Sequence, residues 1–134
     1  MIPDEKQLLL KDLCPRLRYG VLCDRLGQPR KLVGIENRFA GKYTIYLDNG
    51  DYMPIPYAIE DVKPYLRPMS SMTEEERKEI LSIDYAQIHT GNCWSWTFAN
   101  HKQIDWLNAH HFDYRGLIEK GLAMEAPEGM YKED

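Results

Sequence analysis

Residues 42–50 read Lys-Tyr-Thr-Ile-Tyr-Leu-Asp-Asn-Gly, and this stretch decides the fold class of the first half of the chain. Apolar or aromatic side chains recur at every second position, which predicts a β-strand with one buried face. The Asn49-Gly50 dipeptide favours positive φ angles, so we expect a tight turn and a returning strand over 52–57. Pro54 and Pro56 lack amide hydrogens, which confines the returning strand to a sheet edge or a bulge.

The residues before this hairpin predict a short helix followed by further strands. Asp4 can act as the helix N-cap, and we expect Pro15 to end the helix. A period of two from 17 to 23 and a second apolar segment over 31–36 then predict two short strands. Four or five short strands in about 50 residues cannot bury a core as a flat sheet. We therefore expect an N-terminal helix over 1–15 and a small SH3-like β-barrel, or a strongly curved antiparallel sheet, over 16–68.

The second half has helical patterns and one aromatic segment. Thr73 and Glu76 form a capping box, so a helix should start at Glu74. Trp94, Trp96 and Phe98 then predict an extended aromatic segment. Asn100 and Gln103 indicate the start of a second helix. Asp113 can cap a last short helix, which Gly121 would end. The sequence thus predicts one α+β domain over 1–134, with a helical subregion over 73–122 and a loose tail over 123–134.

Composition and charge limit the classes of function. The chain has 134 residues, of which 43% are hydrophobic and 28% charged, as in an ordinary globular domain. Its net charge of −4 disfavours a protein that coats nucleic acid or anionic lipid. The charge is uneven, because residues 1–72 carry 11 Lys and Arg against 9 Asp and Glu, whereas residues 73–134 carry 6 against 12. A local basic surface in the first half remains compatible with this distribution.

No apolar run of membrane-spanning length and no export signal occurs in the sequence, so we expect a cytoplasmic protein. The three cysteines, Cys14, Cys23 and Cys93, are then expected to be reduced and mostly buried thiols. Neither they nor the histidines have the spacing of a zinc site. Glycine-rich phosphate loops are also missing, and we expect no metal and no cofactor.

Two stretches carry a resemblance. Residues 59–76 read Ile-Glu-Asp-Val-Lys-Pro-Tyr-Leu-Arg-Pro-Met-Ser-Ser-Met-Thr-Glu-Glu-Glu, and residues 105–123 read Asp-Trp-Leu-Asn-Ala-His-His-Phe-Asp-Tyr-Arg-Gly-Leu-Ile-Glu-Lys-Gly-Leu-Ala. The sequence of these two stretches resembles a family of small uncharacterised proteins encoded by anaerobic gut bacteria and their phages, and the resemblance covers about the last two-thirds of the chain. The resemblance implies a phage or mobile-element setting and assigns no role to any residue.

The richest group of chemically active side chains lies at 110–115. Imidazole, carboxylate, phenol and guanidinium groups occur together there, as general acid–base catalysis needs, but helix ends and caps explain the same residues. Trp106 precedes them on a helix face that differs from that of Ile104 and Leu107. It can therefore be an exposed interface residue or a buried one that joins the two subregions. The interaction candidates are Trp106, His110, His111, Asp113, Tyr114 and Arg115.

Two further segments could bind nucleic acid. Arg25, Arg30 and Lys31 lie around a predicted hairpin tip, where cations beside exposed backbone could contact phosphates, although a solvated turn explains them equally well. The aromatic segment 94–98 could stack on bases or fill the core.

The sequence favours a non-enzymatic interaction or accessory protein of phage or mobile-element origin, with a protein partner and no membrane. This expectation rests on the missing catalytic spacings and on the common use of small barrels as binding scaffolds. The alternative is nucleic-acid or nucleotide binding through the basic turn. A small enzyme that uses the His110–Arg115 cluster is the least favoured of the three.

Overall fold

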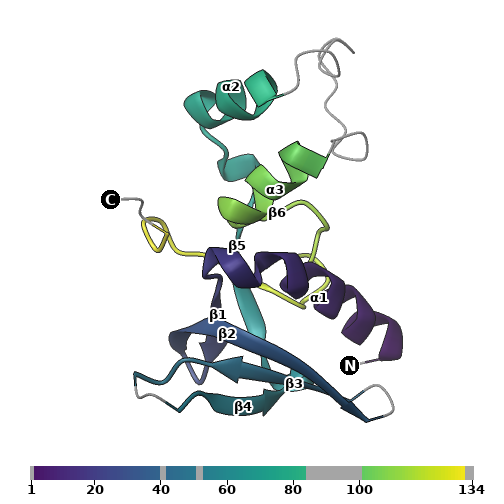
Figure 1. Cartoon of the computed structure of the whole chain (residues 1–134). Coiled ribbons are helices and arrows are strands. Elements are labelled where there is room, and N and C mark those ends of the chain that lie inside the picture. Colours follow the sequence, from purple (N-terminus) through teal and green to yellow (C-terminus); the bar gives the residue numbers. More distant parts are fainter. Residues whose placement is uncertain (1, 40–41, 51–52, 84–100, 132–134) are drawn as a thin grey trace.

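The computed structural model describes residues 2–39, 42–50, 53–83 and 101–131 (Figure 1). The helical elements are α1 (Pro3–Arg16), η1 (Leu17–Tyr19), η2 (Ile59–Asp61), η3 (Met69–Ser71), α2 (Glu74–Ile83) and α3 (His101–Ala109). The strands are β1 (Leu22–Arg25), β2 (Gln28–Phe39), β3 (Lys42–Leu47), β4 (Ile55–Ala58), β5 (Lys63–Pro68), β6 (Phe112–Asp113) and β7 (Met124–Glu125). The predicted aromatic segment 94–98 and Cys93 lie outside the described residues.

The strands form one mixed sheet, and the chain has the predicted α+β fold. The strand order is β4-β3-β2-β1-β5-β6, and β7 also pairs with β5. Strands β1 to β5 are antiparallel to their neighbours, whereas β6 and β7 run parallel to β5. The expected closed barrel or strongly curved sheet is not what forms. The later residues of β5 pair with strands from the C-terminal half of the chain, so β5 does not return to β4 in the described part of the sheet.

Helix α1 is longer than the sequence predicts. It starts after Ile2, whose N–H donates to the Glu5 carboxylate at 3.0 Å, so Asp4 is not the cap. It also continues through Pro15, because a proline in the last turn removes a single helical hydrogen bond and leaves the carbonyl of Lys11 on the exposed side. The expected strand from residue 17 is therefore a 3-10 turn. Gly20, at φ +70°, ends this turn before β1.

A tight hairpin turn lies at Leu26-Gly27, between β1 and β2, within the predicted basic hairpin tip. The hairpin expected around Asn49-Gly50 also forms, between β3 and β4, but without a two-residue turn. Arg25 pairs with Gln28, and both loop residues have positive φ angles, 53° and 83°. The connection from β3 to β4 is longer and covers 48–54, because Leu47 pairs with Ile55. The proline argument is confirmed, since β4, which contains Pro56, is the end strand of the sheet.

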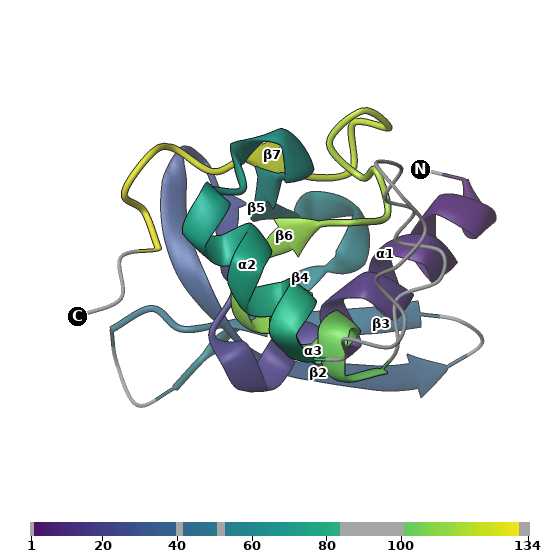
Figure 2. The same cartoon turned by 90° about the horizontal axis from the view of Figure 1, so that it is seen from above.

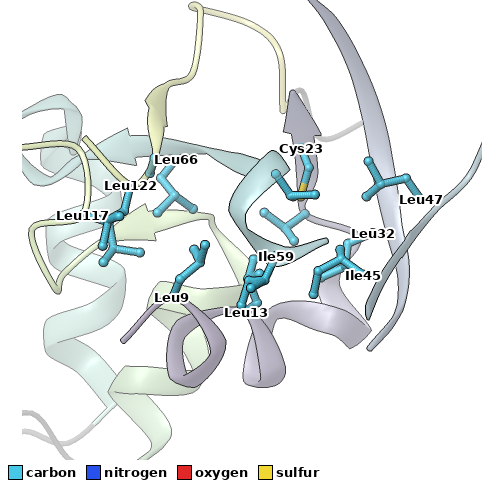
Figure 3. Packing of buried hydrophobic residues seen from close by; sticks show 13 residues of the cluster. Leu9, Leu13, Cys23, Leu32, Ile45, Leu47, Ile59, Leu66, Leu117 and Leu122 are labelled. Atoms are coloured by element: carbon cyan, nitrogen blue, oxygen red, sulfur yellow. The ribbon is translucent and has the colours of Figure 1, made fainter. Parts of the chain in front are cut away.

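The main hydrophobic core lies between α1 and the sheet (Figure 3). Leu9 and Leu13 of α1 point toward side chains from β1, β2, β3, β5 and η2, and Leu117 and Leu122 from the C-terminal half complete the cluster. A second, smaller cluster joins α2, α3 and β6 through Ile80, Trp106, Leu107 and Phe112. Helix α1 lies between the strands β1–β4 and the α2–α3 pair (Figure 1).

The second half confirms two expected helices and corrects two segments. Helix α2 starts at Glu74 and α3 spans His101–Ala109. The expected last helix before Gly121 is a series of turns, although the Asp113 carboxylate does accept backbone N–H groups there. The expected loose tail is instead attached in its described part, 123–131. Strand β7 pairs with β5 (Figure 2). The Tyr131 hydroxyl donates to the Tyr65 carbonyl at 2.7 Å.

Among the described residues, no helix has the length and apolarity needed to cross a membrane.

The capping box of α2 provides the first test. Thr73 N–H donates to the Glu76 carboxylate at 3.0 Å, and Glu76 N–H donates to the Thr73 hydroxyl at 3.1 Å. We expect Thr73→Ala to lower the free energy of unfolding by about 1 kcal/mol, measured by urea denaturation. The control Ser82→Ala, on the same helix, should change it by less than about 0.5 kcal/mol. Equal effects of the two variants would contradict the capping role.

Candidate functional site

A charged pair, Asp12 and Arg16, lies on the buried stripe of α1 and contacts the candidate residues Tyr114 and Arg115. Leu9, Asp12, Leu13 and Arg16 share one face of the helix, because their spacing of three and four residues brings them within one stripe. Both charged side chains are 0% exposed. The Arg16 Nε donates to Asp12 Oδ2 at 2.8 Å, and Nη2 donates to Asp12 Oδ1 at 3.1 Å.

The same guanidinium connects α1 to the C-terminal half of the chain. Arg16 Nη2 donates to the Phe112 carbonyl of β6 at 2.6 Å. Arg115 Nε lies 3.3 Å from Asp12 Oδ1 and brings a second cation to the same carboxylate. Burial raises the pKa of Asp12, and the two arginines oppose this rise. Arg16 Nη1 has no hydrogen-bond partner within the described residues.

The two histidines after α3 are built into the turn that leads to β6. His110 Nδ1 donates to the Trp106 carbonyl at 2.9 Å, and its ring stacks on that of Trp106 with centroids 3.9 Å apart. His111 has a φ of +64°, is 8% exposed and stacks on Tyr131 at 3.7 Å. Burial lowers the pKa of His111 to about 4, helped by Arg16, His110 and Arg67. The imidazole is therefore neutral at pH 7.

The remaining residues of the predicted cluster also make contacts within the fold. The Asp113 carboxylate accepts the N–H groups of Leu117 at 2.9 Å and Ile118 at 3.0 Å. The Tyr114 hydroxyl donates to Asn108 Oδ1 at 3.0 Å, and the guanidinium of Arg115 lies 5.0 Å from the Tyr114 ring centroid. The structure thus gathers the candidates His110 to Arg115 around Arg16, where they orient the chain.

Trp106 is a core residue. It is 8% exposed and lies in the second hydrophobic cluster, where it stacks on Phe112 with ring centroids 5.8 Å apart. Its helix face turns toward α2 and β6, because these elements, and not the solvent, lie beyond α3 on that side. Of the two predictions for Trp106, the buried side chain is the one that forms, and its cluster consists of residues from α2, α3 and β6.

Two cavities adjoin this cluster and share one wall. A cavity of about 440 Å³ is lined by Arg67, Glu79, His110 and His111 among others. A second, of about 580 Å³, lies between the η3–α2 corner and the C-terminal segment 125–131. Arg67, Glu76 and Tyr131 line both. Both volumes fall in the range of about 300–1,000 Å³ that is typical of small-ligand pockets.

The shared wall is held by an ion pair. Arg67 donates through Nη1 and Nη2 to the two oxygens of Glu76, each at 2.7 Å. These hydrogen bonds lower the pKa of Glu76 to about 2, so the carboxylate is charged throughout the neutral range. Because the cation of Arg67 is used in this pair, the described residues that line the two cavities offer no free guanidinium for a phosphate. Within the described ranges, no three His, Cys, Asp or Glu side chains come together as a metal ion would require.

The basic turn is divided between two faces of its hairpin. The guanidinium of Arg25 lies 4.6 Å from the ring centroid of Tyr57, and Arg30 Nη2 donates to Gln28 Oε1 at 3.2 Å. Pairing of Cys23 with Arg30 and of Leu22 with Lys31 places Lys31 on the opposite face of β2. The three cations therefore do not converge on one side of the sheet.

Sequence reasoning missed Arg16, Arg67 and Tyr131, which connect the cluster to the rest of the fold. A signal existed for Arg16, because it lies on the stripe of Leu9 and Leu13 and is four residues from Asp12. The pairing of Arg67 with Glu76 spans an expected helix start and had no such signal.

Comparison with known proteins gives no relative for this site: no family model, no curated protein and no solved structure matches the chain.

The buried ion pair provides a second test. Arg16→Met removes the main counter-charge of a carboxylate that is 0% exposed, so we expect it to lower the free energy of unfolding by about 3–5 kcal/mol. The double variant Asp12→Leu, Arg16→Met removes both charges together and should be less destabilised than Arg16→Met alone. Denaturation of the single and double variants measures the difference. A double variant that loses the sum of the two single effects would contradict coupling of the pair.

His111 should make stability depend on pH in a window set by its own pKa. The folded-state pKa of about 4 lies below the ordinary 6.5, so its contribution to stability is complete above pH 6.5 and is lost as the pH falls toward 4. Between pH 6.5 and 4.5 we expect the free energy of unfolding to fall by about 2–3 kcal/mol from this group. The pKa of Glu76 is lowered from 4.5 to about 2, so its contribution to stability is lost only as the pH falls below about 4.5.

The matched variant is His111→Asn, because asparagine tolerates the positive φ angle and does not titrate. Urea denaturation across the same pH range should show a markedly smaller decline for the variant than for the wild-type protein. Parallel pH profiles of the two proteins would show that His111 does not carry the dependence.

Proposed function

We propose that the protein is a non-enzymatic interaction protein. The observation that carries this proposal is the engagement of the His110–Arg115 cluster, which holds the side chain types that acid–base catalysis would need. His111 is buried and stacked, the Asp113 carboxylate accepts two backbone N–H groups, and Arg115 faces Asp12. The contacts of Asp113 and Arg115 position the backbone, and proton transfer through these groups would require breaking the contacts. His111 Nδ1 has no hydrogen-bond partner among the described residues, but burial lowers the pKa of this imidazole to about 4, so it carries no proton to donate as an acid at pH 7.

We also propose that the unit β1–β5, although its sheet is not closed into a barrel, is a small scaffold with an SH3-like order of strands. Two features support this proposal: the neighbour order β4-β3-β2-β1-β5, and a 3-10 turn, η2, between β4 and β5. The contact of Arg25 with Tyr57 is a third, because it connects β1 to β4 across two intervening strands. Small scaffolds of this kind present their turns and edges to partners.

The setting in a phage or mobile element, and a cytoplasmic location, are parts of the same proposal. The first rests on the resemblance of residues 59–76 and 105–123, and the second on the sequence features given above. An accessory protein of such an element would act through a protein partner.

Nucleic-acid binding through the basic turn is the second candidate, favoured by the position of Arg25 and Arg30 on the two strands of one hairpin. Two observations disfavour this candidate. Arg25 and Arg30 already contact Tyr57 and Gln28, and Lys31 lies on the opposite face of the hairpin. Because binding driven by phosphates weakens steeply with salt, binding of a DNA duplex that is lost on Arg30→Ala and at high salt would favour this candidate.

The proposal predicts that the purified chain has no turnover that depends on its cluster. A panel of hydrolase, phosphatase, nuclease and glycosidase substrates, each with and without divalent cations, should give the same rates for the wild-type protein and for His110→Gln. His110 is the chosen position because it is only half-buried and lines the cavity of about 440 Å³. A turnover that disappears in His110→Gln, while the variant melts like the wild-type protein, would overturn the proposal in favour of the enzyme alternative.

A further inference from the structure

Leu26 breaks a local rule of turn chemistry. In a two-residue hairpin loop with positive φ at both positions, Asn, Asp and Gly are favoured, because a larger side chain clashes with its own backbone. Leu26 has a φ of 53° and is 84% exposed. Leu26 therefore combines a strained backbone conformation with an exposed apolar side chain, and packing within the chain does not offset the strain. Residues that violate local preferences in this way are concentrated at functional sites.

The strands that flank Leu26 are basic. Arg25 precedes it, Arg30 and Lys31 follow it, and no Asp or Glu lies between 25 and 31. Arg25 and Arg30 contact a ring, an amide and a backbone carbonyl, and neither has a carboxylate partner within the described residues. The hairpin tip thus presents one leucine with Arg25 and Arg30 beside it on one face of the hairpin and Lys31 on the other face. A complementary surface would be an apolar pocket with an acidic rim.

The cavity of about 580 Å³ in this same chain has that character. Pro68, Ala126 and Pro127 provide apolar walls, and Glu125 and Glu128 lie among the residues that line it. Both carboxylates belong to exposed residues, and neither has an ion-pair partner in the described part of the chain. Among the described residues that line the cavity, the cation Arg67 is paired with Glu76, which leaves Glu125 and Glu128 as an excess of negative charge. The cavity and the hairpin tip therefore have opposite charge.

We propose that the hairpin tip around Leu26 of one copy docks into the cavity between η3, α2 and the C-terminal segment of a second copy. This inference rests on the proposed interaction function and names its partner. The tip does not fill the cavity of its own chain, because Leu26 is 84% exposed. A contact of one side chain and its neighbours is smaller than the roughly 1,200–2,000 Å² of stable complexes, so the association is weak and depends on concentration.

Sedimentation velocity of the wild-type chain from about 10 μM to about 1 mM covers the affinities expected of such an interface. We expect the weight-average mass to rise above that of the monomer across this range. Leu26→Asn should weaken the association at least tenfold, since it removes the buried apolar group. The same variant should melt at a higher temperature than the wild-type protein, because asparagine suits the positive φ angle. A residue that is needed for folding would behave differently, because its replacement would lower the melting temperature.

The control is Val33→Thr, which removes exposed apolar surface from the same hairpin strand outside the tip and keeps the β-branched shape. It should leave the association within about twofold of the wild-type value.

Charge exchange identifies the docking surface. Arg30→Glu and Glu128→Arg should each weaken self-association, because each places like charges at the contact. A mixture of the two variants should associate again, since the tip of each then faces a cavity of opposite charge. Circular dichroism and melting of each variant check that the fold is retained.

A wild-type chain that stays monomeric at every concentration, or an association unchanged in Leu26→Asn, would overturn the self-docking proposal. Neither result affects the proposed interaction function, which is overturned by cluster-dependent turnover. A DNA duplex bound by the wild-type chain and released by Leu26→Asn would assign the tip to nucleic acid and would also overturn self-docking.

Discussion

The fold depends on a guanidinium that has no access to water. Arg16 is 0% exposed, and a buried charge is costly unless hydrogen bonds and a counter-charge replace its hydration. Asp12 supplies the counter-charge from the preceding turn of the same helix, so the pair can form as soon as α1 forms. The carbonyl of Phe112 supplies the third acceptor from a residue 96 positions further along the chain. This last bond makes the burial of Arg16 dependent on the correct placement of the C-terminal half.

This dependence explains why both hydrophobic clusters lie next to α1. Leu9 and Leu13 use one side of the buried stripe of α1 for the main core, and Asp12 and Arg16 use the other side for β6. Strand β6 then pairs with β5, and the turn before β6 places His111 against Tyr131. Tyr131 in turn binds the backbone of Leu22 and Tyr65, which attaches the C-terminal segment to β1 and β5. These polar contacts act together with the packing of Leu117 and Leu122 in the main core to fix how the two halves meet.

The sequence predicted the local features well. The capping box of Thr73 and Glu76 and the edge position of the strand with Pro56 depend on residues close in sequence, and both are confirmed. The predicted end of α1 and the predicted two-residue turn between β3 and β4 are wrong for a shared reason. Propensity indicates breaks at Pro15 and at Asn49-Gly50, whereas packing of the helix stripe and pairing of Leu47 with Ile55 decide the actual boundaries.

The contacts of the candidate site could not be predicted, because they join residues far apart in sequence. Nothing in the alternation of residues 123–131 indicates that β7 runs parallel to β5, since parallel pairing depends on how the intervening chain returns. Helical rotation separates Trp106 from Leu107, but it would expose Trp106 only if one face of α3 were covered. With α2 on one side and α1 on the other, the helix buries Gln103, Trp106, Leu107 and Asn108 together.

Leu26 stands apart from this pattern because its environment favours a different residue. At Pro15 and Asn49, the sequence preference yielded to tertiary contacts that stabilise the observed structure. At Leu26 the side chain is 84% exposed, and the positive φ angle disfavours leucine relative to asparagine or glycine. A conflict that tertiary packing resolves is a consequence of folding, whereas one that packing leaves in place requires a cause outside the isolated chain. That distinction separates the hairpin tip from the His110–Arg115 cluster, whose side chains pack, pair or hydrogen-bond within the fold, although His111 Nδ1 and Arg115 Nε have no hydrogen-bond partner among the described residues.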